Sequence, residues 1–477
     1  MLPPLIRRPR RNSEPRSKER GVTMALVAIT MVAIISMAAL SIDIGTLYEA
    51  KAEAQRAADA AALTAARIIS LSGLTGTTSA TWGQICGAAG IATLAATNVA
   101  EAQQNWIGGV AAGTVTVNYG AGSSGGPTTD CSGLGADFSV NPTVTVNVQR
   151  TNLPIFFARV FSLFGSRYSG TTVSAAATAE AFNPSGSSPM IPVNPRCVKP
   201  WMVPNQDPGN GARTFVDATS GSIQHAGLSP AGVIGEAFNL IADCQTTRRN
   251  RCHLANPSPQ ATPPSTLQYV PGEASNPSVA IAANPAISGC SAVQNADYWD
   301  AVAGCDQTTV YACGSSLANT VELTDNPGLP GNDSVNAAQC LINATNASPS
   351  NPTTNGQDYL DPGAPAAPPY TYPFQIKAGS NSALRAASVS TNSQITSSPS
   401  LVSLPIYDSV ATPTINGFGT TQVTVIGFLQ VFINSVDSAT GNINVTVMNV
   451  AGCGNSAGGN PTVTGTSPVP VRLITPP

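Results

Sequence analysis

The segment that decides the fold is residues 20–69, RGVTMALVAITMVAIISMAALSIDIGTLYEAKAEAQRAADAAALTAARII. Its first half, from Val22 to Ile42, is 21 residues long and carries no charged side chain. At about 1.5 Å per residue such a helix spans roughly 31 Å, close to the hydrocarbon thickness of a bilayer. The run therefore predicts a single membrane-spanning helix.

The second half of this segment is crowded with alanine. From Glu49 to Ala66, ten of 18 residues are alanine, and small residues line one helical face. The span is therefore predicted to continue outside the membrane in one helix of about 45 residues. Its alanine face is expected to pack on the chain's own domain or on another subunit. Glu53 with Arg56, and Arg56 with Asp59, have the i,i+3 spacing of helical ion pairs.

The charges before the span indicate its orientation. Residues 1–20 carry seven Lys and Arg against two Glu, and such a flank favours the cytoplasm. We therefore expect a cytoplasmic tail, residues 1–20, in a bacterial inner membrane, with the bulk of the chain periplasmic or extracellular. The alternative is a cleaved signal peptide, but the apolar run exceeds the usual h-region of about 7–15 residues.

Composition limits the remaining functions. The chain has 477 residues, enough for two or three domains, and only 10% of them are charged. A net charge of −3 provides no basic field for nucleic acid. No small-molecule substrate, cofactor or metal is expected.

The pattern beyond the first helix predicts an α+β protein. Residues 21–70 form the transmembrane and juxtamembrane helix, and residues 71–182 form a region where a helix lies on a small antiparallel sheet, as in pilins. This region is expected to contain a second helix at 80–106 and strands at 114–118, 143–150 and 169–182. Residues 183–189, NPSGSSP, have the composition of a linker.

Residues 190–477 are predicted to be a mostly β, loop-rich, disulfide-containing region outside the cytoplasm. Its clearest strands are at 401–407, 422–433 and 442–450. Residues 427–433 are apolar on both faces, which is typical of a central strand.

All ten cysteines follow the membrane segment, where an oxidising compartment favours disulfides. They are Cys86, Cys131, Cys197, Cys244, Cys252, Cys290, Cys305, Cys313, Cys340 and Cys453. We expect Cys86 to pair with Cys131 if the first domain folds alone. Cys244 with Cys252, and Cys305 with Cys313, have the spacing of local loops. A zinc site at Cys244, Cys252 and His253 is the alternative, but the spacing is unusual for zinc.

Catalytic motifs are weak in this chain. A hydrolase triad would need His225 or His253, the two histidines present. Residues 454–458 and 122–126 match Gly-x-Ser-x-Gly, but no histidine follows the first and a Gly/Ser loop surrounds the second, so both are interpreted as turns. Asp297 and Asp300 are interpreted as a turn or helix end.

Metal motifs are equally incomplete. An oxygen-rich group at 325–333 does not fit the EF-hand spacing; it comprises Asp325, Asn326, Gly328, Asn332 and Asp333. No catalytic, cofactor-binding or metal-binding residue is therefore predicted.

The opening segment resembles the N-terminal segment of TadE/TadG-like Flp pilus-assembly proteins. The resemblance rests on a basic residue before Gly21, the apolar span, Asp43-Ile44-Gly45 with Tyr48 shortly after, and an alanine run around Asp59. A weaker similarity at residues 153–161 and 173–181 extends it to about residues 20–182.

The family implies a bitopic protein of the machinery that builds Flp pili. Processed, prepilin-like members carry Glu where this chain has Leu26, which argues against cleavage after Gly21. Some TadG-like members carry an Asp-x-Ser-x-Ser metal site; its nearest approach here, Asp137 to Asn141, lacks the last Ser.

Together these features predict a non-enzymatic, membrane-anchored structural or assembly component of an Flp pilus system. It would act by tethering and subunit packing, with pilin-like or pilus-assembly proteins as partners. The alternative is a cell-surface adhesin or ligand-binding protein that uses the same anchor. A secreted hydrolase is a third hypothesis, which replacement of His225 and His253 would test.

Overall fold

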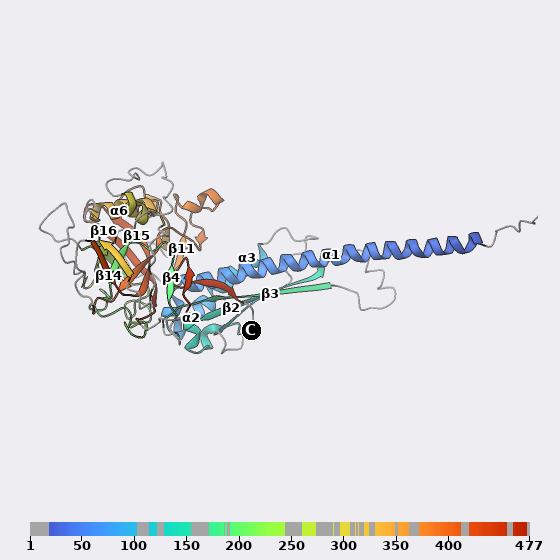
Figure 1. The fold of residues 1–477 in the computed structure, drawn as a ribbon, viewed down its shortest axis with the longest axis horizontal. Coiled ribbons are helices and arrows are strands. Elements are labelled where there is room, and N and C mark those ends of the chain that lie inside the picture. Colours follow the sequence, from blue (N-terminus) through green and yellow to red (C-terminus); the bar gives the residue numbers. More distant parts are fainter. Residues whose placement is uncertain are drawn as a thin grey trace, which may run out of the picture.

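The protein is a rod that ends in a globular head (Figure 1). The computed structural model describes residues 19–102, 114–121, 128–153, 171–185, 187, 191–243, 260–272, 290, 296–305, 311, 313, 319–323, 330–348, 352–361, 372–411, 419–455 and 461–474. The rod is a single helix that a sheet flanks over its inner half, and the head contains a β-barrel.

Helix α1 (Glu19–Leu71) forms the rod and is 53 residues long. At about 1.5 Å per residue its length is roughly 80 Å. The predicted unbroken helix is therefore confirmed and is longer than expected. It ends where Gly73 takes a left-handed backbone, with φ of 68°, and a short 3₁₀ turn η1 (Leu74–Gly76) follows. Glycine adopts this conformation without the steric cost that a Cβ brings.

Two shorter helices follow where the sequence predicts one helix at 80–106. They are α2 (Ser79–Cys86) and α3 (Ile91–Glu101). The break lies at Gly87 and Gly90, where an added Cβ would meet the carbonyl oxygens of Gly83 and Ile85 at 2.5 and 2.4 Å. The chain turns too tightly there for a continuous helix, so the prediction of one helix is wrong.

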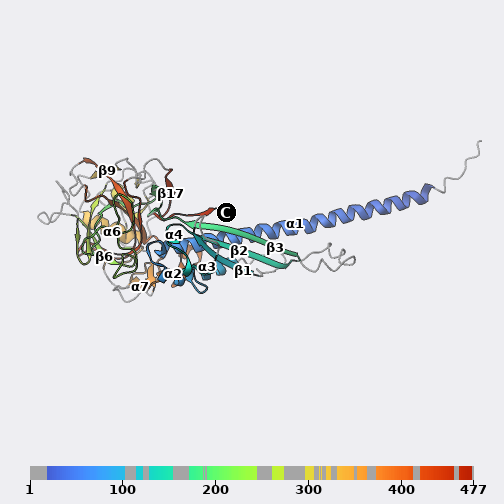
Figure 2. The same ribbon diagram turned by 90° about the horizontal axis from the view of Figure 1, so that it is seen from below.

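A four-stranded antiparallel sheet lies along the inner half of α1 in both views (Figures 1 and 2). Its order is β1 (Thr114–Ala121), β2 (Pro142–Leu153), β3 (Thr171–Ala181) and β18 (Val471–Ile474). Helix α1 contacts β2 and β3, and α3 packs beside it. The strands predicted at 114–118, 143–150 and 169–182 are all present, within a few residues of the expected bounds.

The last strand of this sheet comes from the far end of the chain. β18 pairs with β3 in antiparallel register, with Leu473 opposite Ala179. Just before it, β17 (Val463–Gly465) pairs in parallel with β4 (Val193–Pro195). Residues 190–477 therefore do not fold apart from the first sheet, because their final strand completes it.

The head contains a closed ring of six strands. The order is β5 (Trp201–Pro204), β13 (Leu401–Tyr407), β15 (Val425–Asp437), β16 (Asn442–Gly452), β6 (Ala237–Ala242) and β8 (Thr266–Pro271). The pairing of β8 with β5 closes the ring. The predicted central strand at 427–433 lies within β15, between β13 and β16.

Small elements cover the barrel and the sheet. The remaining helices are α4 (Asp137–Val140), α5 (Ala296–Ala303), α6 (Pro330–Leu341) and α7 (Pro352–Asn355), with 3₁₀ turns η3 (Cys131–Gly133) and η5 (Ala383–Ala387). The remaining strands are β7 (Ala261–Thr262), β9 (Asn319–Leu323), β10 (Tyr359–Asp361), β11 (Gln375–Lys377), β12 (Gln394–Ile395) and β14 (Gly419–Val423). Helix α6 contacts β15, β16 and β6 and so covers one side of the barrel.

Four disulfides connect these parts: Cys86–Cys131, Cys197–Cys305, Cys290–Cys340 and Cys313–Cys453. The first is the pair expected for the N-terminal region. The expected local loop between Cys305 and Cys313 is wrong, because each reaches a distant partner, 108 and 140 residues away. Cys244 and Cys252 lie outside the described residues. Long-range bridges suit a head whose connections are long and irregular.

Candidate functional site

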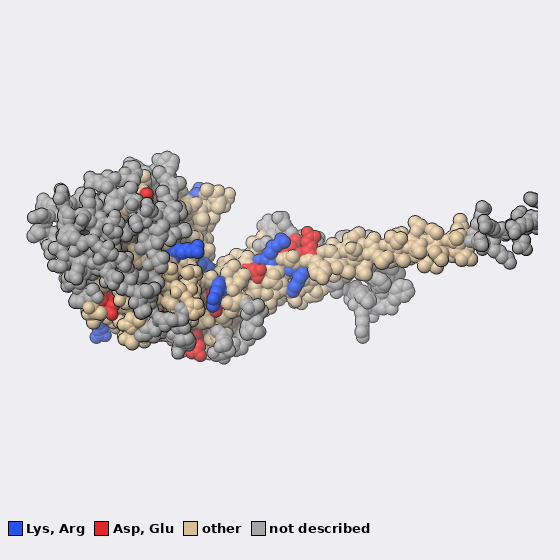
Figure 3. Space-filling model, in the orientation of Figure 1, with Lys and Arg blue, Asp and Glu red and all other residues tan. Residues whose placement is uncertain are grey.

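The outer half of α1 is an exposed apolar helix without a partner in the described part of the chain. Met24 is 80% exposed and Ile29 is 70% exposed, and the rod has no charged side chain there (Figure 3). Within the described residues one helix is long and apolar enough to cross a membrane, and none of its most apolar window is buried. Exposure of these apolar side chains to water is unfavourable, whereas exposure to the hydrocarbon of a bilayer is favourable.

The family-motif residues lie where this apolar surface ends. Asp43 is 3% exposed, and its carbonyl oxygen accepts a hydrogen bond from Thr46 Oγ1 at 2.8 Å. Gly45 faces open space, since nothing lies within 4 Å of where its Cβ would be. Tyr48 is 74% exposed. Within the residues that the structure describes, no contact explains a glycine and an exposed aromatic ring at these two positions.

The alanine face of α1 packs inside the chain. Its members are fully buried, and they are Ala54, Ala57, Ala58, Ala61, Ala62, Ala65 and Ala66. They meet α3, whose Ala92, Ala96 and Ala100 are also buried, and the small residues of β3. Of the two expectations for this face, packing on the chain's own domain is what the structure shows. A partner subunit would have to meet the opposite face of the helix.

Polar side chains attach α1 to the sheet beneath it. Arg150 on β2 donates from Nη1 to Glu53 Oε2 at 2.9 Å, with its side chain fully buried. Burial lowers the pKa of Arg150, and the charge of Glu53 opposes that shift. Gln55 donates to Asp59 Oδ1 at 2.8 Å and to the carbonyl of Ala176 on β3 at 3.1 Å. Glu53 therefore pairs across to the sheet, although its spacing predicts a pair with Arg56.

A buried polar cluster joins the rod to the barrel at the end of α1. Asn449 on β16 donates to the carbonyl of Ser70 at 2.7 Å, and Ser70 Oγ donates to the carbonyl of Val469 at 2.7 Å. Asn183 Nδ2 donates to Thr75 Oγ1 at 2.8 Å and to the carbonyl of Val450 at 3.0 Å. The predicted linker at 183–189 thus begins with a fully buried residue, and the joint is packed.

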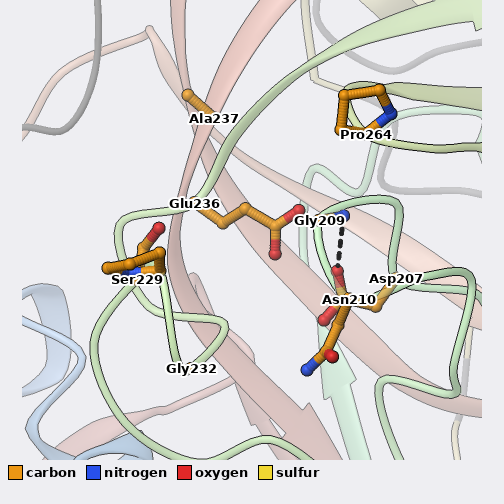
Figure 4. Close-up of a pocket in the computed structure, with 9 residues that line it drawn as sticks. Asp207, Gly209, Asn210, Ser229, Gly232, Glu236, Ala237 and Pro264 are labelled. Atoms are coloured by element: carbon orange, nitrogen blue, oxygen red, sulfur yellow. Dashed lines mark hydrogen bonds between the residues drawn. The ribbon is translucent and has the colours of Figure 1, made fainter.

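A cavity of about 410 Å³ lies against the barrel and contains two facing carboxyl groups (Figure 4). Asp207 belongs to the loop after β5, and Glu236 directly precedes β6. Asn210, Ser229 and Pro264 also line the cavity. Burial, together with the hydrogen bond and charge of Asp207, raises the pKa of Glu236 to about 9, and burial raises the pKa of Asp207.

The sequence did not indicate this pair. Asp207 precedes Pro208 and Gly209, a combination that predicts a turn, and Glu236 stands alone before a strand. The two carboxylates are 29 positions apart, at no spacing typical of a helix, strand or metal motif. Only the closure of the barrel brings them together.

The other sequence candidates do not form a site in the described part of the chain. Asp137 and Ser139 belong to the short helix α4, and Gly454 has a left-handed φ of 62°, as in a turn. Among the described residues no group of three or more His, Cys, Asp and Glu could hold a metal ion. His253, residues 122–126 and residues 325–328 lie outside the described residues, as do the side chains of Asp297, Asn332 and Asp333.

Comparison with known proteins gives one match. Residues 21–67 match the model of the family described as "Putative Flp pilus-assembly TadE/G-like", which confirms the resemblance expected for this segment. No curated protein and no solved structure matches the chain. The matched segment is α1 almost in full, so the family evidence and the exposed apolar helix coincide. Together they support a membrane-anchored protein that takes part in Flp pilus assembly.

Proposed function

We propose that this chain is a single-pass structural component of an Flp pilus system that acts by tethering and packing rather than by catalysis. The observation that carries the proposal is the continuity of α1. One helix runs from an exposed apolar half into a half buried against β2, β3 and α3. The family match covers both halves.

This geometry suits a tether because the head cannot turn freely about the anchor. The Arg150–Glu53 pair holds the helix to the sheet, and the cluster around Asn449 fixes its end to the barrel. Residues 1–20 carry seven cations, which supports a cytoplasmic N-terminus and a head outside the cytoplasm. The disulfides agree with an oxidising compartment.

The helix face opposite the alanines is the surface that we assign to a pilin-like or pilus-assembly partner. Gly45 lies on this face at the membrane boundary with open space around it, and Tyr48, which is largely exposed, lies beside it. A helix-interior glycine costs about 1 kcal/mol relative to alanine. Since no contact in the described part of the chain requires Gly45, close approach of a second helix would explain it.

Site-specific photocrosslinking in the bacterium that carries the gene tests this role. A photoreactive amino acid replaces Tyr48, which is 74% exposed, and in a matched control replaces Val410 on the head, which is 72% exposed. We expect a crosslinked pilus-assembly protein from position 48 and none from position 410, with Gly45→Leu reducing the yield several-fold. Equal crosslinking at both positions, or piliation unaffected by deletion of the gene, would contradict the proposal and favour the adhesin alternative.

A further inference from the structure

The cavity beside the barrel contains two carboxyl groups that are almost completely buried. Asp207 is 1% exposed and Glu236 is 8% exposed. Asp207 Oδ2 and Glu236 Oε1 are both buried, and in the described part of the chain the hydrogen-bond partner of each carboxyl group on this side is the other carboxyl group. Both side chains line the cavity, and the close-up shows the two carboxyl groups directed toward one another (Figure 4).

Such a pair needs a positive charge between its members. Two ionised carboxylates at contact distance in a buried site repel each other strongly, so one of them holds a proton unless a cation replaces it. An electrostatic effect of His225 acts on Asp207 as well, more weakly than burial does. The structure thus leaves two candidates for the countercharge: a shared proton or a bound cation.

The surrounding backbone holds the pair in place. Gly209 donates its N–H to Asp207 Oδ1 at 3.1 Å, and the Glu236 carbonyl accepts from Val447 on β16 at 2.8 Å. A Cβ on Gly209 would lie 2.1 Å from Glu236 Oε1. Glycine at this position therefore lets the Glu236 carboxylate lie against the loop and face Asp207. The site is built from two anchored segments and does not depend on mobile surface side chains.

We propose that Asp207 and Glu236 bind a calcium ion in this cavity. Carboxylate oxygens are hard, anionic ligands, and Asn210 and Ser229 line the same cavity. Calcium accepts six to eight oxygen ligands in irregular arrangements, whereas magnesium demands near-octahedral geometry. A cavity of about 410 Å³ also has room for the waters that complete the shell. Binding would tie the loop after β5 to the start of β6.

The test is isothermal titration of the full chain, in detergent and stripped of metal, with CaCl₂ and separately with MgCl₂. The variants are Glu236→Gln, whose amide donates to Asp207 as the protonated acid does, and Asp207→Asn. Asp217→Asn is the matched control, since its carboxylate is bonded to Thr219 and Ser220 at the surface.

We expect one calcium ion per chain and a loss of affinity of tenfold or more in both site variants but not in Asp217→Asn. Absence of calcium binding at millimolar concentration, or equal binding by Glu236→Gln, would overturn the site. Equal affinity for magnesium would overturn the choice of metal. The calcium and magnesium titrations of the wild-type chain test binding and the choice of metal by themselves, so the proposal stays testable if a variant misfolds.

Discussion

The ion pair between Glu53 and Arg150 gives the sharpest test of how α1 is held to its sheet. Glu53→Gln removes the carboxylate that faces a fully buried guanidinium at 2.9 Å. Removal of one partner from a buried pair costs about 3–5 kcal/mol, because it leaves an uncompensated charge. The side chain of Glu53 is 18% exposed and glutamine keeps an acceptor oxygen, so we expect a smaller loss of about 2 kcal/mol.

The measurement is thermal unfolding of the full chain in detergent, followed by near-ultraviolet circular dichroism. A loss of about 2 kcal/mol lowers the midpoint by roughly 5 °C for a domain of this size. Glu49→Gln is the matched control, since Glu49 lies one helical turn away and is exposed; its change should stay within about 0.5 kcal/mol.

A double replacement distinguishes the effect of an uncompensated charge on stability from the effect of a change in side-chain volume. Glu53→Leu together with Arg150→Met substitutes apolar groups of similar volume for the pair, and such exchanges are often neutral or stabilising. We expect the double variant to melt close to the wild type. If Glu53→Gln and Glu49→Gln unfold at the same midpoint temperature, the reasoning about an uncompensated buried charge is wrong. It is also wrong if the double variant has the lowest midpoint of all.

Two further predictions concern the joint and the cavity. Gly73→Ala should destabilise the chain by more than about 1 kcal/mol. The new Cβ would lie 2.5 Å from the Met448 carbonyl oxygen, and the backbone has a left-handed φ of 68°. Gly45→Ala is the control in the same thermal unfolding experiment and should be neutral or stabilising, because nothing lies within 4 Å of its new Cβ. In metal-free buffer the free energy of unfolding should fall as pH rises from about 5 to about 9. In the folded chain the pKa of Glu236 is raised from 4.5 to about 9, so over this range the folded state keeps a proton that the unfolded chain has released. Glu236→Gln should flatten this dependence; an unchanged slope would show that other groups cause it.

The elements that the sequence predicted well are those that a local pattern determines. The charge-free run from Val22 to Ile42 and the alanine run after it give α1, because both are helix-compatible and no glycine or proline interrupts Val22 to Ile44. Strand β13 has the predicted bounds of 401–407, since a short and mostly apolar run marks it. Where the prediction of a second helix was wrong, Gly87 and Gly90 mark the break.

The remaining features depend on contacts between residues far apart in the sequence, which no local pattern encodes. Arg150 meets Glu53 across 97 positions, and Cys313 meets Cys453 across 140. These pairs exist because the barrel closes and because β18 returns to the first sheet. The carboxyl pair of Asp207 and Glu236 has the same origin: each residue is unremarkable in its own segment, and the cavity between them forms only when β5 and β6 take their places in one ring.

The change of side-chain size along α1 follows from the two environments that the helix crosses. In lipid a helix gains from large apolar side chains that face outward, and Met24 and Ile29 do so. Outside lipid the same helix must bury its surface against protein, and alanine lets α3 and the sheet approach closely. Large residues on the inner half would hold α3 and β3 away from the axis, whereas alanines on the outer half would weaken insertion. The boundary near Asp43 is therefore where the requirement changes, and in the described part of the chain Gly45 and Tyr48 lie open just beyond it.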